Sequence, residues 1–329
     1  MEYLHSLMTQ EFLGKEAWLW VGFLGLIVVL MAMDLGLFRK EAREISFRES
    51  LTMYGFYMFL AMLFGAWVWY RFGSEAGAAY YTGYFIEQSL SMDNLFVMSL
   101  IFMHLAVPRS CQHRVLFWGI LGVIILRGLM IGVGVWVIEH FHWVLMLFGG
   151  FLIYTGIRML FQVEDEEEIN FEEHKVLRFL TKRMRVTMTM DGDKFFIRED
   201  YRGDGKIILC ATPIFLALCL IEISDVIFAV DSIPAIFVIT TDPYIIFTSN
   251  LFAILGLRSL YFGLSAIMHR FVYVKYSLAV VLTMIGAEIF YNHFFGKVDT
   301  VLTLAATLLL LIVGIGASLL RPEEKKSST

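Results

Sequence analysis

Two stretches of this chain place acidic side chains inside apolar sequence. The acids are Glu222, Asp225 and Asp231 within residues 221–240, and Glu87 and Asp93 in a weaker echo upstream. A charged group at the centre of a bilayer costs about 3 kcal/mol on insertion scales. Such residues persist where they pair with another charge, line a wet cavity or bind an ion. The two stretches therefore mark a candidate ion site.

The two stretches repeat one pattern. Each has an acid, five intervening residues, a second acid and a small polar residue, as in Glu87…Asp93-Asn94 and Asp225…Asp231-Ser232. An arginine then follows in the next apolar run of each copy: Arg127 and Arg258. We interpret the pattern as two copies of a three-helix unit. An odd number of crossings inverts the second copy, which is a common transporter design with its site at the midplane.

Composition defines the setting of these motifs. Hydrophobic residues make up 58% of the 329 residues and charged residues only 17%, and mean hydropathy is +0.70. Soluble domains carry nearer a quarter charged residues. Apolar runs of membrane-spanning length recur at 17–38, 51–71, 79–103, 115–138, 141–161, 208–240, 246–268, 273–292 and 299–320. We therefore predict an all-α polytopic membrane protein of about nine helices, with an inverted three-plus-three repeat in helices 3–5 and 6–8.

Basic residues orient the chain. Lys and Arg concentrate in alternate connections, at 39–50, 109–114, 162–207, 270–275 and after 320. By the positive-inside rule, we predict a multi-pass membrane protein with its N-terminus outside and its C-terminus in the cytoplasm. A location in the bacterial inner membrane is implied only by the resemblance to a known family described below. The first residues lack a basic region, so we expect no cleaved signal peptide.

Three parts are expected along the chain. Residues 1–161 carry the first five helices with the first repeat, and 208–329 carry four more with the second repeat and a cytoplasmic tail. Between them, 162–207 forms a cytoplasmic linker or small domain. Its acidic run at 164–168 is typical of a solvated linker. We expect a surface helix over 171–185 and a hairpin over 187–198.

Inversion of the second copy sets the depths of the acids. Glu87 and Asp231 should share an outer layer, whereas Asp93 and Asp225 share an inner layer, with Glu222 one turn further in. Six residues rotate a helix by about 240°, so Glu87 and Asp93 cannot share one face of a regular helix. Either the helices unwind here or the two acids face different neighbours.

Pro234 favours a break in the sixth helix, because proline cannot donate to the carbonyl of Val230. Carbonyls freed by such a break could serve as ligands around a cavity.

The expected ligands are oxygen atoms. The metal candidates are Glu87, Asp93, Asn94, Glu222, Asp225 and Asp231, supported by Asp34, Arg127, Ser232, Asn250 and Arg258. Oxygen donors favour the hard cations Mg²⁺, Ca²⁺ and Mn²⁺. Two arginines against six acids leave the interior negative, which argues against an anionic substrate. Exchange of protons for metal is an open alternative.

Other classes of function find little support. Cys111, Cys210 and Cys219 have no metal-ligand or redox spacing, so we expect no enzyme and no prosthetic group. No basic patch suggests a nucleic-acid partner. A purely structural network of the acids with Arg127 and Arg258 is the alternative to an ion site, and for Asp34 a role in helix pairing is an equal alternative.

Residues 83–94, 222–237 and 248–258 resemble the TerC family of integral membrane proteins, in particular its Alx-type members. The resemblance covers about 18–320. It implies a place in the LysE-like transporter group, built on inverted repeats, and export of Mn²⁺ as the transported ion. Older labels of the family are tellurium resistance and redox modulation. The family's acidic motif falls on the six metal candidates given above.

The sequence therefore predicts an exporter of divalent cations that works by alternating access. The alternative is a membrane scaffold or stress protein that recruits partners through 162–207, for tellurium resistance or metal loading. Besides the bilayer and the cation, a homo-oligomer or a cytoplasmic partner of 162–207 remains open.

Overall fold

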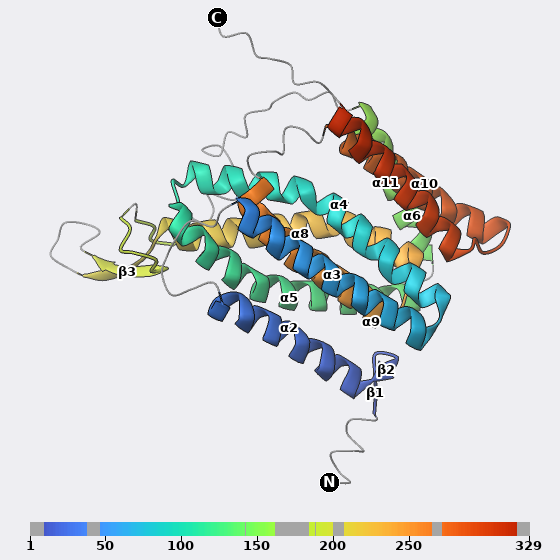
Figure 1. Ribbon diagram of the computed structural model, residues 1–329, viewed down its shortest axis with the longest axis horizontal. Coiled ribbons are helices and arrows are strands. Elements are labelled where there is room, and N and C mark those ends of the chain that lie inside the picture. The colour runs from blue at the N-terminus through green and yellow to red at the C-terminus, as the bar shows by residue number, and fades with distance from the viewer. Residues whose placement is uncertain are drawn as a thin grey trace, which may run out of the picture.

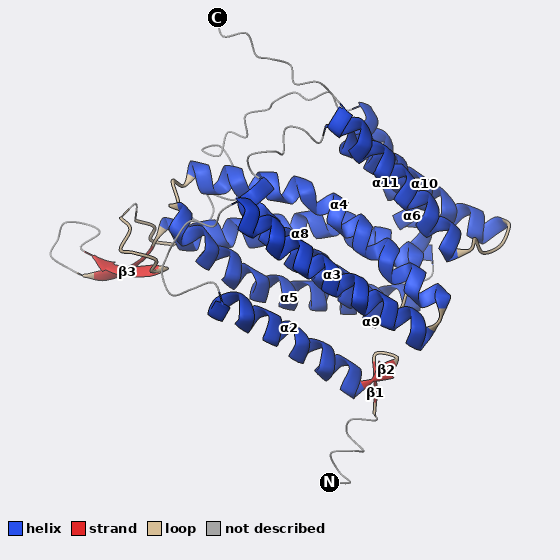
Figure 2. Ribbon diagram, viewed as in Figure 1, coloured by secondary structure: helices blue, strands red, loops and turns tan. Residues whose placement is uncertain are grey.

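The computed structural model describes residues 10–37, 47–141, 143–161, 184–187, 189–199, 207–264 and 272–320. These residues fold almost entirely into helices, with two short antiparallel strand pairs (Figure 2). The first pair joins β1 (Glu11–Phe12) to β2 (Lys15–Glu16), and the second joins β3 (Phe196–Glu199) to β4 (Ile208–Ala211). The predicted surface helix over 171–185 lies almost wholly outside the described residues.

Nine long helices are present in the described part of the chain. They are α2 (Ala17–Leu37), α3 (Phe47–Phe72), α4 (Ser74–His104), α5 (Arg109–His140), α6 (Trp143–Phe161), α8 (Pro213–Ile239), α9 (Pro243–Leu264), α10 (Val272–Phe294) and α11 (Thr300–Leu320). Seven of them are long and apolar enough to cross a membrane; α4 is not among these seven, and α2 has a shorter apolar stretch, Ala17–Met33. The all-α polytopic membrane class is confirmed, while the inverted repeat stays a prediction.

The long apolar run at 208–240 divides differently from the prediction. Its first residues form β4, and α8 begins at Pro213, where proline needs no partner for a missing N–H. The expected break at Pro234 is wrong, because α8 continues through it to Ile239. Both α4 and α8 therefore stay helical through their acidic motifs, so acids six residues apart must face different neighbours.

Local sequence signals explain the turn between α3 and α4 and the start of α9. Gly73 adopts φ 93° and allows α3 to turn directly into α4. Before α9, the carboxylate of Asp242 accepts the backbone N–H of Tyr244 at 3.0 Å and caps the helix start.

The helices form two groups around a central set (Figure 1). On one side, α6, α10 and α11 pack together, and on the other side α2 lies along the bundle. Most of the residues of α9 are buried, so this helix is the centre of the fold.

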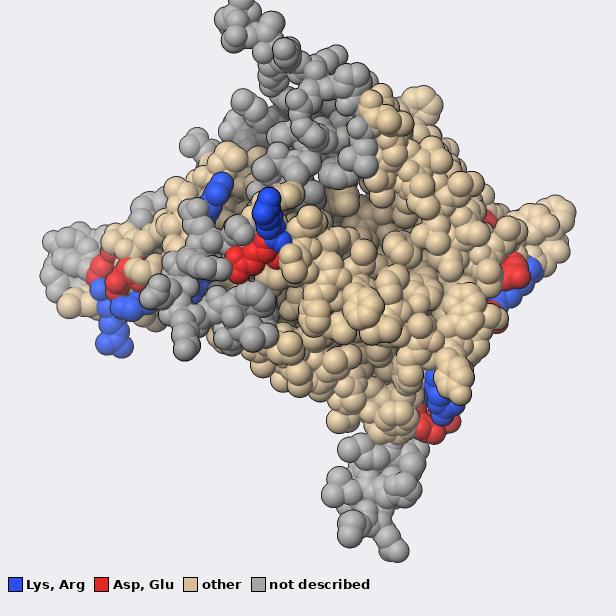
Figure 3. All heavy atoms as spheres, in the orientation of Figure 1, with Lys and Arg blue, Asp and Glu red and all other residues tan. Residues whose placement is uncertain are grey.

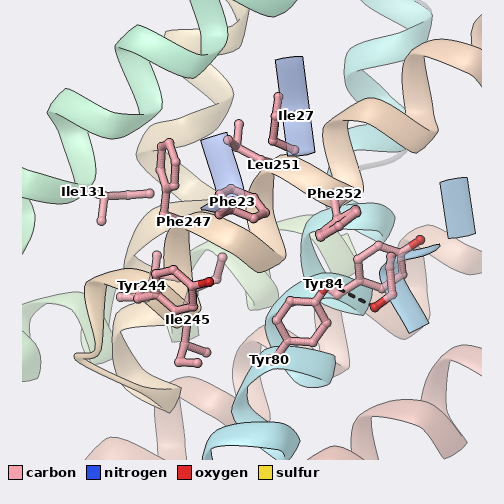
Figure 4. Packing of buried hydrophobic residues seen from close by; sticks show 14 of the residues in the cluster. Phe23, Ile27, Tyr80, Tyr84, Ile131, Tyr244, Ile245, Phe247, Leu251 and Phe252 are labelled. Carbon is pink, nitrogen blue, oxygen red and sulfur yellow. Dashed lines mark hydrogen bonds between the residues drawn. The ribbon is translucent and has the colours of Figure 1, made fainter. Parts of the chain in front are cut away.

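Aromatic side chains fill the space between α2, α3 and α9 (Figure 4). Phe23 of α2 lies 5.5 Å from the ring of Phe64 and 5.8 Å from that of Phe252. The ring centroids of Tyr244 and Phe247 of α9 lie 6.3 Å and 6.0 Å from that of Phe23. Buried aromatic pairs of this kind contribute beyond their area alone, so they fix α2 against the core.

Charged side chains gather at the ends of the bundle. On the face that Figure 3 shows, a broad surface without Lys, Arg, Asp or Glu separates the charged groups among the described residues. One end of the bundle holds the starts of α3, α5, α8 and α10 and the ends of α2, α4, α6 and α9. We call it the basic end, because it carries Arg48, Arg109, Arg114 and Arg198. Seven helices long and apolar enough to cross a membrane run between these charged ends.

The β3–β4 hairpin projects from the basic end (Figure 1). The predicted hairpin over 187–198 is wrong in its pairing, since β3 pairs with β4 rather than with residues before Asp191. The turn at Asp191–Asp193 instead docks on α5, where Arg114 forms an ion pair of 2.6 Å with Asp193 and lies over the ring of Phe195 at 4.9 Å.

The same loop, residues 189–195, is tied to the start of α8. Thr212 donates its N–H to the carbonyl of Phe195 at 2.9 Å and its hydroxyl to the carbonyl of Lys194 at 2.8 Å. One short loop therefore joins the basic ends of α5 and α8.

Glycine at position 156 should be essential for the contact between α6 and α10. A Cβ added there would lie 2.3 Å from the hydroxyl of Thr283 and 2.6 Å from the carbonyl of Ala279. Overpacking of this kind costs about 1–3 kcal/mol, so Gly156→Ala should lower the thermal unfolding temperature of the purified protein in detergent. Gly150→Ala on the same helix meets no atom within 4 Å and serves as the control; equal stability of the two variants would contradict the packing.

Candidate functional site

The sequence-predicted residues gather between α4, α5, α8 and α9, in two clusters at different depths. The outer cluster contains Glu87, Ser91, Arg127, Ser232 and Asn250. The inner cluster, nearer the basic end, contains Asn94, Glu222, Asp225 and Arg258. The side chains of Asp34, Asp93 and Asp231 lie outside the described part, so their contacts are not defined here.

In the outer cluster, Glu87 is completely buried and fully bonded. Arg127 donates to both of its carboxylate oxygens, at 2.9 and 3.3 Å. Asn250 donates to Oε2 at 3.0 Å and Ser91 to Oε1 at 2.9 Å. Because four donors already bond to its two oxygens, the carboxylate of Glu87 is not available to bind a metal ion in this conformation.

Arg127 also connects two elements that are far apart in sequence. Its Nη1 donates to the hydroxyl of Ser232 on α8 at 2.9 Å. The guanidinium thus links Glu87 of α4 to the residue that follows Asp231. The predicted outer layer of Glu87 and Asp231 stays a prediction, because the side chain of Asp231 lies outside the described part.

In the inner cluster the bonding is much less complete. Asn94 donates through Nδ2 to Oδ1 of Asp225. Arg258 approaches the other oxygen, with 3.5 Å between Nη2 and Oδ2, and its Nη1 donates to the carbonyl of Leu116. Asp225 thus bonds to the residue after Asp93, while the predicted inner layer of Asp93 and Asp225 itself stays a prediction.

The two clusters therefore share one design. In each, an acid of one helix pairs with an arginine of the next helix, and a small polar side chain from the other acidic motif bonds to one member of the pair: Ser232 to Arg127 and Asn94 to Asp225. Such crossed contacts are what an inverted repeat would produce. Arg127 and Arg258 each pair with a buried acid, as the structural network that was the alternative to an ion site also requires.

Glu222 distinguishes the inner cluster. It lies three residues before Asp225 on the same face of α8, and its carboxylate points at α5. A Cβ added at Gly122 would lie 2.3 Å from Oε2, and one at Gly119 would lie 3.0 Å from Oε1. The two glycines thus make the room that this carboxylate occupies.

Several buried oxygen atoms of these residues have no hydrogen-bond donor. They are Oε1 and Oε2 of Glu222, Oδ2 of Asp225, Oδ1 of Asn94 and Oδ1 of Asn250. Leaving a buried acceptor unsatisfied costs about 1–3 kcal/mol, and more for a charged group. Four of the five belong to the inner cluster, so the free acceptors concentrate there.

A cavity, here called the central cavity, lies between the clusters. It is lined by Ser91, Asn94, Arg127, Asp225 and Arg258, together with apolar side chains. Both arginines and the free oxygen of Asp225 thus border one space. Within the described residues, no three His, Cys, Asp or Glu side chains come together as a preformed metal site.

Some contributors were not predicted from the sequence. Ser91 lies one turn after Glu87 on α4, and that i,i+4 spacing could have revealed its bond. Gly119 and Gly122 carry no such signal in the sequence, and only the structure shows Glu222 against them.

The fold and these buried ion pairs define the class: a polytopic α-helical membrane protein with charged groups between its helices. The chain belongs to the TerC family. The family described as "Integral membrane protein TerC family" matches residues 72–326.

Full-length relatives agree with this assignment. An uncharacterized membrane protein of Myxococcus xanthus is 43% identical over 310 residues, which cover 94% of each chain. An uncharacterized membrane protein of Rickettsia bellii is 42% identical, over 92% of this chain and 97% of its own. A protein of Salmonella typhi named "Putative membrane-bound redox modulator Alx" is 43% identical, over 84% of this chain and 86% of its own. No solved structure matches this chain.

Removal of one partner from the outer ion pair should destabilise the protein strongly. Arg127→Gln leaves Glu87 buried without a counter-charge, which costs about 3–5 kcal/mol. The double variant Arg127→Gln/Glu87→Gln should recover much of that loss, because it removes the buried charge. Thermal unfolding in detergent measures both effects as a double-mutant cycle.

The exposed pair of Lys297 with Glu75 provides the control for this cycle. Lys297→Gln should change stability little, as is usual for surface ion pairs. An Arg127→Gln protein as stable as the unmodified one would show that the buried pair does not hold α4 to α5.

Proposed function

We propose that this protein exports a divalent cation, with Mn²⁺ as the ion, across the bacterial inner membrane by alternating access. The observation that carries the proposal is the group of buried oxygen acceptors without donors at the inner cluster. A bound cation would satisfy them, as water or a donor does at other buried sites.

The chemistry of the acceptors favours a hard cation. Carboxylate oxygens of Glu222 and Asp225 and an amide oxygen of Asn94 are the ligands that Mg²⁺, Ca²⁺ and Mn²⁺ prefer. No sulfur or imidazole belongs to either cluster. Within this group of ions, the resemblance of the acidic motifs to Alx-type chains selects Mn²⁺.

The unequal hydrogen bonding of the two clusters supports entry of the cation from the basic end. Asp225, Glu222 and Asp93 would receive the ion from the basic end, and Asn94 would complete its shell. Glu87 and Asp231, with Ser232, would pass it on, but Glu87 is held by Arg127, Asn250 and Ser91. This conformation therefore corresponds to a state that loads from the basic end and is closed at the outer cluster.

The proposal includes no chemical reaction on the ion and no prosthetic group. The name of the Salmonella typhi relative refers to redox modulation. In this chain Cys111, Cys210 and Cys219 are free, and none belongs to either cluster. Whether protons move in exchange for the cation is left to the experiment.

Uptake of metal into inside-out vesicles tests the proposal. Vesicles with the unmodified protein should accumulate Mn²⁺ in preference to Ca²⁺, Mg²⁺ and Zn²⁺. Asp225→Asn and Glu222→Gln should lower Mn²⁺ uptake at least about tenfold, since each removes a charged ligand at equal protein level. A pH-sensitive dye inside the vesicles reports any accompanying proton movement.

Glu288→Gln is the matched control for these carboxylates. Glu288 is a partly buried acid of α10 that accepts the hydroxyl of Thr303 at 3.0 Å, away from both clusters. Its variant should transport normally.

Unchanged Mn²⁺ efflux in Asp225→Asn would refute the site. Absence of transport of every cation in the unmodified protein would favour the scaffold alternative, which a deletion within 162–207 would then test.

A second test uses the room that Glu222 occupies. Gly122→Ala should displace its carboxylate and lower Mn²⁺ uptake about tenfold, because the added Cβ would lie 2.3 Å from Oε2. Gly132→Ala on the same helix meets nothing within 4 Å and should transport normally. Equal uptake by the two alanine variants would argue that the position of Glu222 is unimportant.

A further inference from the structure

A second cavity lies beside the inner cluster, between α2, α3, α5 and α9. Its lining includes Met31 of α2, Tyr57 of α3, His113 of α5 and Ser259 of α9. We call it the vestibule. Neither acidic motif contributes to it, so it is distinct from the central cavity.

The vestibule belongs to the basic end of the bundle. His113 lies in the second turn of α5, and Ser259 lies in the last turns of α9. Met53, another lining residue, lies in the second turn of α3. By contrast, Val123 of the central cavity lies deeper along α5 than the vestibule residues of that helix, whereas on α9 the two linings adjoin at Ile254 and Leu255.

Arg258 is the polar side chain that the two cavities share. It lines the vestibule together with Leu116 and Ser259, and it lines the central cavity together with Asp225. Its Nη1 donates to the carbonyl of Leu116, while Nη2 lies 3.5 Å from Oδ2 of Asp225. The guanidinium thus contacts a wall of each space.

The hydrogen bonding of the Arg258 guanidinium is incomplete. Its Nε and Nη2 are buried without a hydrogen-bond partner, and so is Oδ2 of Asp225. Arg127 in the outer cluster, by contrast, makes three such bonds with Glu87 and Ser232. Of the two arginines, Arg258 is therefore the one that can leave its acid at lower cost.

We propose that the vestibule is the route by which a divalent cation enters the central cavity from the basic end, and that Arg258 is its gate. The proposal rests on the proposed function. A guanidinium between the cavities repels an approaching cation. When the cation reaches Asp225 and Glu222, it replaces the positive charge of Arg258, and the guanidinium then remains with the carbonyl of Leu116.

Cysteine accessibility tests the route without any transport assay. In a background with Cys111, Cys210 and Cys219 replaced by Ala, single cysteines are introduced as Ser259→Cys in the vestibule and Val123→Cys in the central cavity. A membrane-impermeant trimethylammonium-ethyl methanethiosulfonate is added to inside-out or right-side-out vesicles. Arg198→Cys on the exposed face of the hairpin identifies the side of the basic end.

Ser259→Cys should react from the side on which Arg198→Cys reacts. Val123→Cys should react slowly from that side, and at least about tenfold faster once Arg258→Gln is added, because the repelling charge is gone. Labelling of Ser259→Cys only from the opposite side, or not at all, would overturn the route. An equal rate for Val123→Cys with and without Arg258 would overturn the gate.

The design separates the two proposals. Failure of Mn²⁺ uptake in the unmodified protein would refute the proposed function and leave the labelling pattern to be judged by itself. If Arg258→Gln does not reach the membrane, Ser259→Cys with Arg258 intact still decides the route. Slower labelling of Val123→Cys in the presence of Mn²⁺ alone then supports entry of the cation into the central cavity, and an unchanged rate counts against it.

Discussion

Neutralisation of buried carboxylates by two arginines is the constraint on which the rest of the structure depends. Glu87 and Asp225 lie almost without exposure inside the bundle, and each meets a guanidinium of the following helix. A lone charge in such a place would be prohibitive. The pairs therefore join α4 to α5, and α8 to α9, across a group in which α4 and α5 both pack against α8 and α9.

The pairs are unequal, and this inequality gives the protein a polarity along the membrane normal. Arg127 donates two hydrogen bonds to Glu87. Arg258 makes only a longer ion pair with Asp225, with 3.5 Å between Nη2 and Oδ2. Glu222 adds a second carboxylate at the level of Asp225, in a space that exists because α5 has glycine at 119 and 122. The oxygen atoms without a donor are thus concentrated in the inner cluster, and of the described outer cluster only Oδ1 of Asn250 lacks one.

Hydropathy predicted the helices well because the length of an apolar run is set by the bilayer. It failed at 208–211, where an apolar stretch suits a strand as well as a helix, and pairing with β3 decides the outcome. The break expected at Pro234 does not occur, because one missing donor is tolerated when neighbouring helices pack on both sides of α8. The turn at Asp191–Asp193 was recognised, but its docking on Arg114 is a long-range contact that local sequence does not encode.

The site was predictable to the level of residue types, since intramembrane acids and arginines are rare and conspicuous. The identity of each pair was not, because Arg127 could reach either acidic motif by sequence alone. Gly122 is a clear case: a glycine in a membrane helix usually allows close packing, and only the three-dimensional neighbour reveals that it accommodates a carboxylate.

The loop 189–195 has a mechanical consequence. It binds Arg114 of α5 and Thr212 at the start of α8, and these helices also carry Arg127 and Asp225. A displacement of α5 that parts Arg127 from Glu87 must therefore strain this loop or carry it along. The exposed carboxylate of Asp193 is therefore attached, through Arg114, to the helix that carries the buried Arg127.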